Sequence, residues 1–424
     1  MRFGAPLDVG EVHARALDAA DPLRHERAAF RLPTDADGQP LAYLAGNSLG
    51  VQPLAAREAV MAILEQWGEL GVDAWFAPGT AWLDVERTYA EATARIVGAR
   101  PGEVTTANTL SVNLHLLLAA LYRPSGQRTR ILIDAPTFPS DRYVVESQLR
   151  HHGLDPATHL VTVQPRHGEA TLRSVDLEAA IHQERDRLAV ALLAGVNYAT
   201  GQALDIPRLT AAVHEAGGVA IWDLAHAAGN IELALHDAGV DAAAWCTYKY
   251  LNGGPGAVAQ LFVHERHDGA SAAGGLHGWW GTEPSARFRM GAPFAPAPGA
   301  DAFRVSTPPI LSLVPVGVAL AMVDVVGMPA LRARSIALTG YLEALLGALL
   351  PSATILTPSE PSARGAQLSI RVPEAAARHA ALARFGVVGD VREPDIIRFA
   401  PAPLYSTYHD AWRAATALAT TADG

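Results

Sequence analysis

One lysine stands out among the residues of this sequence that could do chemistry. Lys249 is the single lysine among 424 residues, whereas 32 arginines carry the remaining strongly basic charge. Arginine replaces lysine on a solvated surface but not as an amine nucleophile, because its guanidinium group stays protonated. A biased composition alone would also leave one lysine somewhere, so the neighbouring residues have to decide whether Lys249 does covalent chemistry.

An acid and a histidine precede Lys249 at a spacing that suits one cofactor. Asp223 follows an apolar run, and His226 comes three residues later. Pyridoxal phosphate (PLP) needs an amine that holds its aldehyde as a Schiff base and an acid that keeps its pyridine nitrogen protonated. Taken singly, Asp223 is more simply a helix N-cap and His226 a core histidine. Together with the sole lysine they favour a PLP site.

The elements that must position these residues follow an alternating pattern. The sequence predicts strands at residues 131–134, 189–193 and 219–222, and helices at 177–187 and from Pro207 to the glycine pair at 217–218. This alternation is typical of an α/β domain with a mostly parallel sheet. Because ligands bind at the carboxyl ends of such strands, we expect Asp134, Asp223 and the turn after Val196 on one functional edge. Lys249 is expected on the next β-like run.

We divide the chain into three segments. Residues 1–45 carry helical signals and should pack on the small domain or on a partner subunit. Residues 46–300 should form the large cofactor-binding domain, which ends in a stretch rich in proline, glycine and alanine. Residues 301–424 should form a smaller α+β domain that begins with a long helical region and continues with shorter mixed elements.

Composition and charge exclude several classes of protein. Half of the residues are hydrophobic and 18% are charged, which excludes a disordered chain. The net charge of −10 argues against nucleic-acid binding, which needs a basic surface. The apolar stretch at 309–327 contains Pro315 and Asp324, so we expect a buried helix and no membrane span. The single cysteine, Cys246, and an N-terminus without an apolar signal core predict a cytoplasmic protein.

Motifs along nearly the whole chain resemble those of kynureninases, which are PLP enzymes of the aspartate-aminotransferase fold type (fold type I). They are GNSLG at 46–50, SVNL at 111–114, FPSD at 138–141, VNYATG at 196–201, DLAH at 223–226, CTYKYLNGG at 246–254, GWWG at 278–281, STPPI at 306–310, REP at 392–394 and PLY at 403–405. Each motif is a weak signal by itself. Their joint order and spacing is specific, and it implies a large domain with a mostly parallel sheet and a smaller C-terminal domain.

The resemblance implies which residues hold the cofactor ring. Lys249 matches the Schiff-base lysine, Asp223 the partner of the pyridine nitrogen, and His226 the residue that supports the ring and its acid. Phe138 matches the aromatic side chain that stacks on the ring, although alone it would be a core phenylalanine. In the same motif, Pro139, Ser140 and Asp141 match the cofactor pocket.

Other matches imply the phosphate site. Leu110 and Ser111 match the turn that holds the phosphate at a helix N-terminus, with Ser111 in place of a common threonine. Tyr248 and Trp279 match further donors through their phenol and indole groups. Thr307 matches the position that reaches this site from the second subunit of the family's homodimer, where some members carry asparagine.

A third set of matches concerns the substrate. Arg398 matches the arginine that binds the α-carboxylate, because a planar guanidinium group suits a carboxylate bidentately. A surface arginine is the simpler alternative, but the flanking apolar residues predict a half-buried strand. Asn47 and Ser48 belong to a glycine-flanked loop that is either part of the substrate site or a simple turn. Trp75 and Trp280 are either contacts of the substrate ring or core residues.

The resemblance implies hydrolysis of the Cβ–Cγ bond of L-kynurenine to anthranilate and L-alanine, in tryptophan degradation or towards NAD biosynthesis. 3-Hydroxykynurenine, which would give 3-hydroxyanthranilate, is the alternative substrate, and Thr307 and Trp75 favour the unsubstituted one. Lys249 would move the proton at Cα, and Tyr248 is a candidate general acid or base. Thr282 departs from the family, which usually has histidine there.

Four other functions are alternatives. A cysteine desulfurase needs a nucleophilic thiol on a mobile loop, and Cys246 is expected on a buried strand; an aminotransferase is a further fold type I alternative. A non-catalytic binding protein on the same fold predicts loss of the lysine, the acid or the arginine, and all three are present. Metal hydrolysis lacks the usual ligand spacing, since His151-His152 and His264–His267 are typical of turns and helix ends, and no metal is expected.

Overall fold

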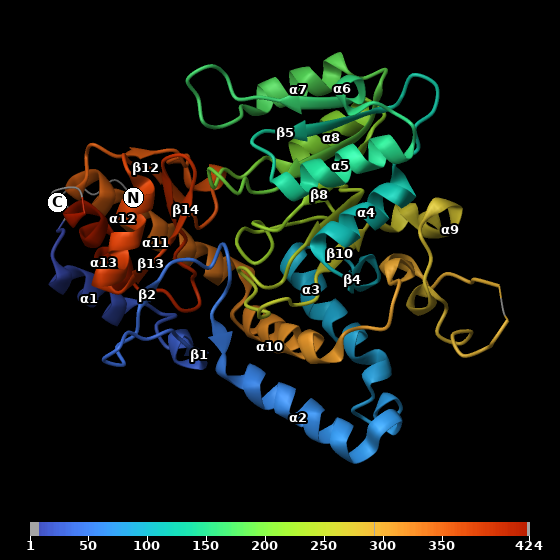
Figure 1. Cartoon of the computed structure of the whole chain (residues 1–424), viewed down its shortest axis with the longest axis horizontal. Helices are drawn as coiled ribbons and strands as arrows, with labels where there is room; N and C mark the ends of the chain where they lie inside the picture. The colour runs from blue at the N-terminus through green and yellow to red at the C-terminus, as the bar shows by residue number, and fades with distance from the viewer. Residues whose placement is uncertain (1–7, 292, 422–424) are drawn as a thin grey trace.

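A seven-stranded sheet forms the centre of the molecule. The computed structural model describes residues 8–291 and 293–421. The strands lie in the order β4 (Val104–Thr106), β10 (Gln260–Val263), β9 (Ala242–Trp245), β8 (Val219–Asp223), β7 (Leu188–Ala194), β5 (Arg130–Asp134) and β6 (Leu160–Val163). Strands β9 to β6 pair in parallel, whereas β10 runs antiparallel to both of its neighbours. The expected α/β fold with a mostly parallel sheet is confirmed (Figure 1).

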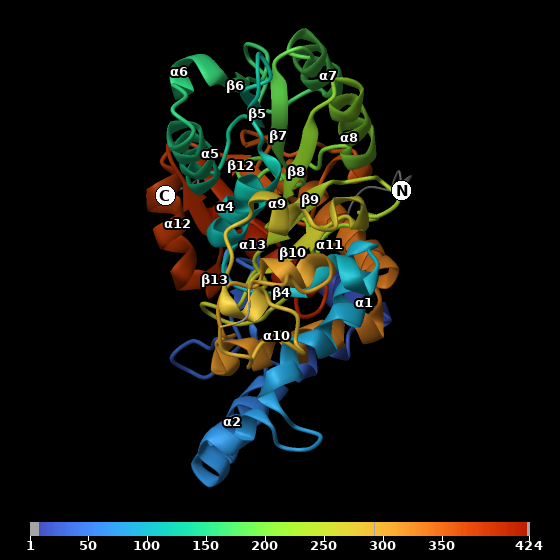
Figure 2. The same ribbon diagram turned by 90° about the vertical axis from the view of Figure 1, so that its right-hand side faces the viewer.

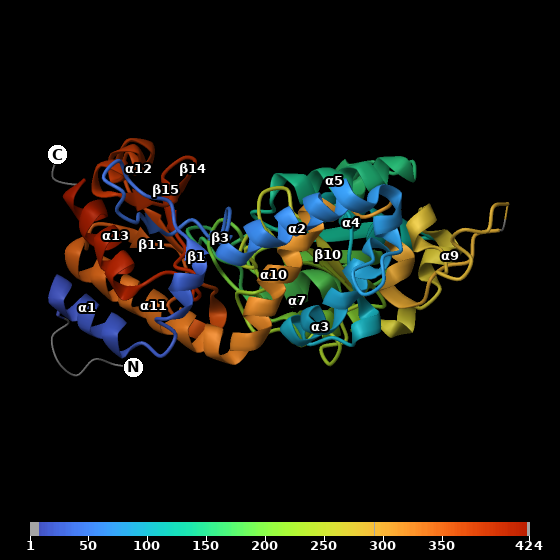
Figure 3. The ribbon, with the colours of Figure 1, turned by 90° about the horizontal axis from the view of Figure 1, so that it is seen from below.

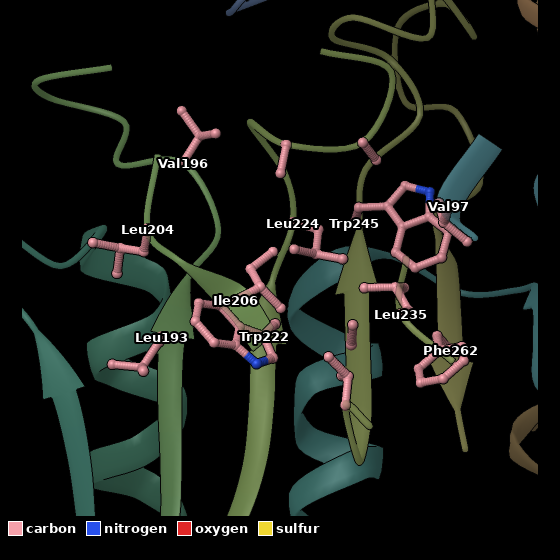
Figure 4. Close-up of a cluster of buried hydrophobic side chains, with 14 of the residues drawn as sticks. Val97, Leu193, Val196, Leu204, Ile206, Trp222, Leu224, Leu235, Trp245 and Phe262 are labelled. Atoms are coloured by element: carbon pink, nitrogen blue, oxygen red, sulfur yellow. The ribbon is translucent and has the colours of Figure 1, made fainter. Parts of the chain in front are cut away.

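The side chains of this sheet fill two separate cores. Helices α4 (Leu110–Leu121) and α5 (Pro139–His151) cover one face, and α7 (Ser174–Gln183) and α8 (Ile206–Glu215) cover the other (Figure 2). Successive side chains of a strand point to opposite faces, so Ile221 of β8 packs with α4 and α5, and Trp222 packs with α7 and α8. Figure 4 shows Trp222 among Leu193, Ile206 and Leu224 in the second core.

A smaller antiparallel sheet lies beside the first. Its strands are β11 (Thr354–Ile355), β12 (Leu368–Arg371), β15 (Ile396–Phe399) and β14 (Asp390–Arg392), in that order. Helices α11 (Met328–Leu349), α12 (Ala375–Leu382) and α13 (Tyr408–Thr420) share its core. Helix α1 (Glu11–Ala20) packs on α13, where the Asp18 carboxylate accepts hydrogen bonds from the backbone N–H groups of Tyr408 (2.7 Å) and His409 (3.1 Å).

The remaining elements join the two sheets. Helix α10 (Ile310–Val326) packs against α2 (Leu54–Leu70) and α3 (Ala90–Val97), which lie beside it when the molecule is seen from below (Figure 3). Helix α2 extends from the body of the molecule (Figures 1 and 2). Short strand pairs join β1 (Phe30–Arg31) to β3 (Gln52–Pro53) and β13 (Val387–Val388) to β2 (Ala42–Tyr43), and α6 (Pro156–His159) and α9 (Ala270–Gly274) are single short helices. The segment limits at residues 45 and 300 stay predictions.

The apolar stretch at 309–327 forms a partly buried helix, as expected. Helix α10 occupies it and ends at Gly327, whose φ of +82° turns the chain into α11. Within the described ranges, no helix by itself is long and apolar enough to cross a membrane, and α10 and α11 meet those criteria only as a pair that bends by 84°.

The predicted elements between residues 131 and 223 are confirmed with one correction, and the expected position of Lys249 needs a second. The helix expected at 177–187 begins earlier and ends at Gln183. The expectation that Lys249 lies on a strand is wrong, because β9 ends at Trp245 and the chain then turns. That turn is closed by a hydrogen bond from the Gly253 N–H to the Thr247 carbonyl (2.8 Å), and Asn252 has a φ of +56° within it.

The two cores make a direct prediction about stability. Val190 in β7 is fully buried, whereas Val325 on α10 is 87% exposed. Val190→Ala removes two methyl groups from a close-packed site and should lower the free energy of unfolding by about 2 kcal/mol. The matched change Val325→Ala should alter it by less than about 0.5 kcal/mol. Urea unfolding of both variants measures the difference, and equal effects would contradict the described packing.

Candidate active site

A cavity of about 160 Å³ lies at the carboxyl ends of β7 and β8, where ligands of parallel sheets bind. Ala194 and Asp223, the last residues of these two strands, both line it. Many residues expected at the site also line it: Asn47, Ser48, Leu110, Phe138, Asp141, His226, Tyr248, Lys249 and Arg398. The fold therefore brings together residues that lie up to 351 positions apart in the sequence.

A glycine packs the first of these segments against the Lys249 turn. The Gly50 N–H donates a hydrogen bond to the Tyr248 carbonyl (2.7 Å). A Cβ atom at Gly50 would lie 2.5 Å from the Lys249 carbonyl oxygen, so no larger residue fits. The close approach holds Asn47 and Ser48 at the cavity, which favours the site interpretation of this loop over a simple turn.

Lys249 and His226 are in direct contact. The Lys249 amine lies 2.9 Å from His226 Nε2, and the His226 side chain is buried. Burial, together with the positive charges of Lys249, Arg398 and Arg392, holds the pKa of His226 well below its ordinary value. A neutral imidazole can accept a hydrogen bond from an ammonium group, so His226 positions the lysine amine at neutral pH.

Buried carboxyl groups surround the end of β8. Asp223 accepts a hydrogen bond from the Ala225 N–H (2.8 Å), and Asp141 lies close to it on α5. Burial and the negative charge of Asp223 raise the pKa of Asp141 well above its ordinary value. Burial also raises the pKa of Asp134, at the end of β5, to about 6, despite hydrogen bonds from Ala194 N–H (2.9 Å) and Asn197 (3.4 Å). These three buried carboxyl groups are therefore most stable when one of them carries a proton or when a cation lies beside them.

Two helix N-termini meet beside the cavity. Helix α4 begins at Leu110 and α5 at Pro139, and neither has a side chain capping its first N–H groups. The hydroxyl groups of Ser111 and Ser140 lie 2.6 Å apart and connect the two helices. Free backbone N–H groups and hydroxyls at helix N-termini are donors for a phosphate. The ring of Phe138 lies next to them, with its centroid 5.9 Å from the Lys249 amine.

Arg398 on β15 is buried and fixed from several sides. Its Nε donates to Asp390 Oδ1 (2.6 Å), its Nη2 contacts Asp390 Oδ2, and its Nη1 donates to the Tyr198 carbonyl. The half-buried strand position expected for this arginine is correct, although the side chain is more deeply buried than expected. The cavity also includes Arg392, which lies 3.3 Å from Asp390.

Sequence reasoning missed several residues of the cavity. Arg392 belongs to a motif that carried the resemblance, but no role was attached to it. Tyr198 stands in another such motif, and its ring packs edge-to-face with Phe138 at 5.2 Å between centroids. Thr137 and Asp390 had no signal in the sequence: Thr137 is seen only as part of the cavity lining, and Asp390 only through its hydrogen bond with Arg398.

Seven expected site residues do not line the cavity: Ser111, Pro139 and Ser140 at the two helix N-termini, and also Trp75, Trp279, Trp280 and Thr307. Trp280 is buried and its indole N–H donates a hydrogen bond to Glu86 (2.6 Å). Its ring packs edge-to-face with that of Trp75, with 5.7 Å between ring centroids. This aromatic cluster favours the core interpretation of both residues. Trp279 is about half exposed and donates to the Arg287 carbonyl (2.7 Å), and Thr307 is exposed. The last two remain available to a second subunit.

One histidine cluster is close enough to suggest a metal centre. Glu103, His236 and His264 offer ligand atoms within 4.8 Å of one another. However, Glu103 already binds His236 (2.9 Å) and the Glu265 N–H (3.0 Å), and His264 Nδ1 accepts a hydrogen bond from the Arg266 N–H (3.2 Å). The two imidazole rings also stack face to face at 4.8 Å, so their in-plane lone pairs do not converge on one ion. A structural role explains this cluster.

Comparisons with known proteins show what this chain is similar to. Residues 331–418 match the family model described as the kynureninase C-terminal domain. A kynureninase of Salinispora tropica is 52% identical to this chain over 421 residues, which cover 97% of each chain. A kynureninase of Xanthomonas oryzae pv. oryzae is 51% identical over 407 residues, which cover 95% of this chain and 96% of that one.

The chain belongs to the kynureninase family. Kynureninases are PLP-dependent hydrolases, so the expected family, enzyme class, reaction and cofactor are confirmed. Two solved structures share the fold. A variant of C-DES with glycine covalently linked to its PLP cofactor has a TM-score of 0.76 at 18% identity, covering 89% of this chain and 96% of that one. The cysteine desulfurase CsdA of Escherichia coli has a TM-score of 0.75 at 17% identity, covering 95% of this chain and 97% of that one.

The cavity fits the cofactor of this family. Buried polar atoms without a hydrogen-bond partner within the described chain include Asp141 Oδ1, His226 Nδ1 and Asn47 Oδ1, all on residues that line the cavity. Unsatisfied buried groups are costly, so they indicate partners supplied by a ligand. An amine, a buried acid pair, an aromatic ring and two helix N-termini are the groups that PLP requires.

Covalent trapping tests the position of the cofactor. Reduction of the holoenzyme with borohydride should attach the cofactor to Lys249 alone, because no other lysine exists in the chain. Peptide mass spectrometry of the digested protein locates the label. Lys249→Arg should keep the fold, lose the visible absorbance band of the bound cofactor and carry no label. A label on another side chain would contradict the assignment.

Proposed function

We propose that this chain cleaves L-kynurenine by hydrolysis, as a homodimer in the cytoplasm, and prefers it to 3-hydroxykynurenine. Water adds to the γ-carbonyl carbon, the Cβ–Cγ bond breaks, and Cβ keeps the electron pair and takes a proton, which gives anthranilate and L-alanine. The observation that carries the proposal is the cavity that holds Lys249 with Asp223, Phe138 and Arg398.

The cavity residues have distinct tasks in holding the cofactor. Lys249 binds its aldehyde, Asp223 holds a proton at the pyridine nitrogen, and Phe138 covers the ring. Ser111 and Ser140, with the first N–H groups of α4 and α5, bind the phosphate. When bound, PLP supplies a protonated ring that withdraws electrons from the substrate.

Protons are moved by Lys249 and Tyr248. The Lys249 amine takes the proton from the substrate Cα, and contact with His226 keeps the amine directed to that point. Burial raises the pKa of the Tyr248 phenol, so Tyr248 stays protonated at neutral pH and acts as the acid that delivers a proton at Cβ. Arg398 binds the substrate α-carboxylate, and Asp390 keeps its guanidinium group in place.

A second subunit would complete the site. Trp279 and Thr307 are exposed at positions where the family resemblance implies phosphate contacts. Exposed apolar side chains accompany them on α2 and on the loop around Trp279: Leu54, Met61, Trp67, Leu276, Phe288 and Met290. Such patches mark interaction surfaces, which supports a homodimer in which each chain supplies donors to its partner. The single cysteine, Cys246, suits a reducing location.

The desulfurase alternative has little support. Cys246 is buried directly after β9, and burial raises the pKa of its thiol, so the nucleophilic thiolate is disfavoured. The likeness to desulfurases is below 20% identity and concerns the fold alone.

Product formation and one arginine test the proposal together. The holoenzyme should release anthranilate and L-alanine from L-kynurenine with a higher kcat/KM than it shows for 3-hydroxykynurenine. Arg398→Ala should raise KM about 100-fold, because it removes charge-assisted hydrogen bonds worth about 2.7 kcal/mol. The control Arg371→Ala changes a half-exposed arginine on the neighbouring strand β12 and should leave KM unchanged. No cleavage of either substrate would refute the proposal, and an unchanged KM in Arg398→Ala would remove Arg398 from the carboxylate site.

A further inference from the structure

A buried glutamine, which no motif identified, lies behind the cavity. Gln367 is fully buried just before β12, and its side chain links two cavity residues. Its Nε2 donates to the Tyr198 carbonyl (2.9 Å) and to Ser369 Oγ (2.9 Å), and its Oε1 accepts a hydrogen bond from Asn47 Nδ2 (2.9 Å). The Tyr198 carbonyl also accepts a hydrogen bond from Arg398.

These contacts fix the orientation of both side-chain amides. The Tyr198 carbonyl can only accept, and Ser369 Oγ already donates to the Ala199 carbonyl (2.6 Å), so the NH₂ group of Gln367 must face them. The Oε1 of Gln367 then faces Asn47 and can only accept. Asn47 must therefore turn its NH₂ group to Gln367, and its Oδ1 faces the other way.

That orientation leaves an acceptor in need of a donor. Asn47 is 1% exposed and lines the cavity, and its Oδ1 has no partner within the described chain. An unpaired buried acceptor is unfavourable unless a ligand supplies an N–H or O–H group. A carboxylate cannot do so, whereas an ammonium group carries three N–H donors.

We propose that Asn47 Oδ1 accepts a hydrogen bond from the α-ammonium group of the incoming amino acid, and that Gln367 is the positioning residue that holds Asn47 in this orientation. The inference rests on the proposed function, in which Arg398 binds the α-carboxylate. The ammonium nitrogen and the carboxylate share one carbon atom in any α-amino acid, and Asn47 and Arg398 are joined through Gln367 and the Tyr198 carbonyl. The cavity thereby recognises both groups together.

Two ligands separate the ammonium contact from the carboxylate contact. L-Alanine carries both groups, whereas propionate has the carboxylate without the amine. Reduction with borohydride fixes the cofactor on Lys249 as a secondary amine, so an added amino acid cannot exchange onto it and keeps its ammonium group. In calorimetric titrations of the reduced holoenzyme, Gln367→Leu and Asn47→Ala should each raise the Kd of L-alanine about tenfold, as expected for the loss of one such hydrogen bond. The Kd of propionate should change less than about twofold. The double variant should bind L-alanine no more weakly than the weaker single variant, because the two residues act as one unit.

A second buried glutamine provides the matched control. Gln260 in β10 is also fully buried and hydrogen-bonds to Thr93, Thr106 and Trp245, away from the cavity. Gln260→Leu should lower thermal stability as Gln367→Leu does, yet leave the Kd of L-alanine unchanged. An isosteric variant tests rescue: in Gln367→Glu the defect should shrink at low pH, where the new carboxyl group is protonated and donates to the Tyr198 carbonyl again.

The outcomes are distinguishable from those of the proposed function. An unchanged Kd of L-alanine in Gln367→Leu, an equal loss of propionate affinity, or additive effects of the two substitutions would each overturn the inference. Failure of Arg398→Ala to weaken propionate binding would instead overturn the carboxylate role of Arg398. Absence of kynurenine cleavage would overturn the proposed reaction and leave the L-alanine titrations interpretable.

Discussion

Buried charge must be balanced, and the site depends on this constraint. Asp134 and Asp223 end strands at one edge of the sheet and Asp141 lies in the first turn of α5, where little water reaches any of them. Burial and mutual repulsion raise the pKa values of Asp134 and Asp141, so the group is stable only with a proton or a cation among its members. A protonated pyridine ring would supply the positive charge that this group needs.

The sheet explains how such a group is held together. Parallel strands place their carboxyl ends at one edge, and helices α4 and α5 begin at that same edge with free N–H donors. A bound phosphate would find donors at the helix N-termini, while the acids would hold the proton of the pyridine nitrogen. The smaller sheet adds Arg398 and Gln367 from the other side, so substrate recognition needs both parts of the molecule.

Local patterns predicted a large part of this arrangement. The strand before Asp223, the sole lysine and the motif at Phe138 were visible as residue types at specific spacing, and the sheet topology follows from alternating strands and helices. The contacts of Arg398 were not predictable in detail, because Asp390 carries no pattern until β14 pairs with β15. The expectation that Lys249 lies on a strand is wrong, because β9 ends at Trp245 and the turn that carries Lys249 packs against Gly50. The positions of Trp279 and Thr307 outside the cavity could not be derived from the residues, because the resemblance alone placed them at the phosphate site.

The protonation state of the bound ring tests the central claim most directly. Nitrogen NMR of holoenzyme loaded with PLP labelled at the pyridine nitrogen reports whether that atom carries a proton. The account predicts a protonated nitrogen at neutral pH in the native enzyme, and its loss in Asp223→Asn, where the neutral amide no longer stabilises the positive charge. An unprotonated nitrogen in the native enzyme, or an unchanged signal in Asp223→Asn, would contradict it.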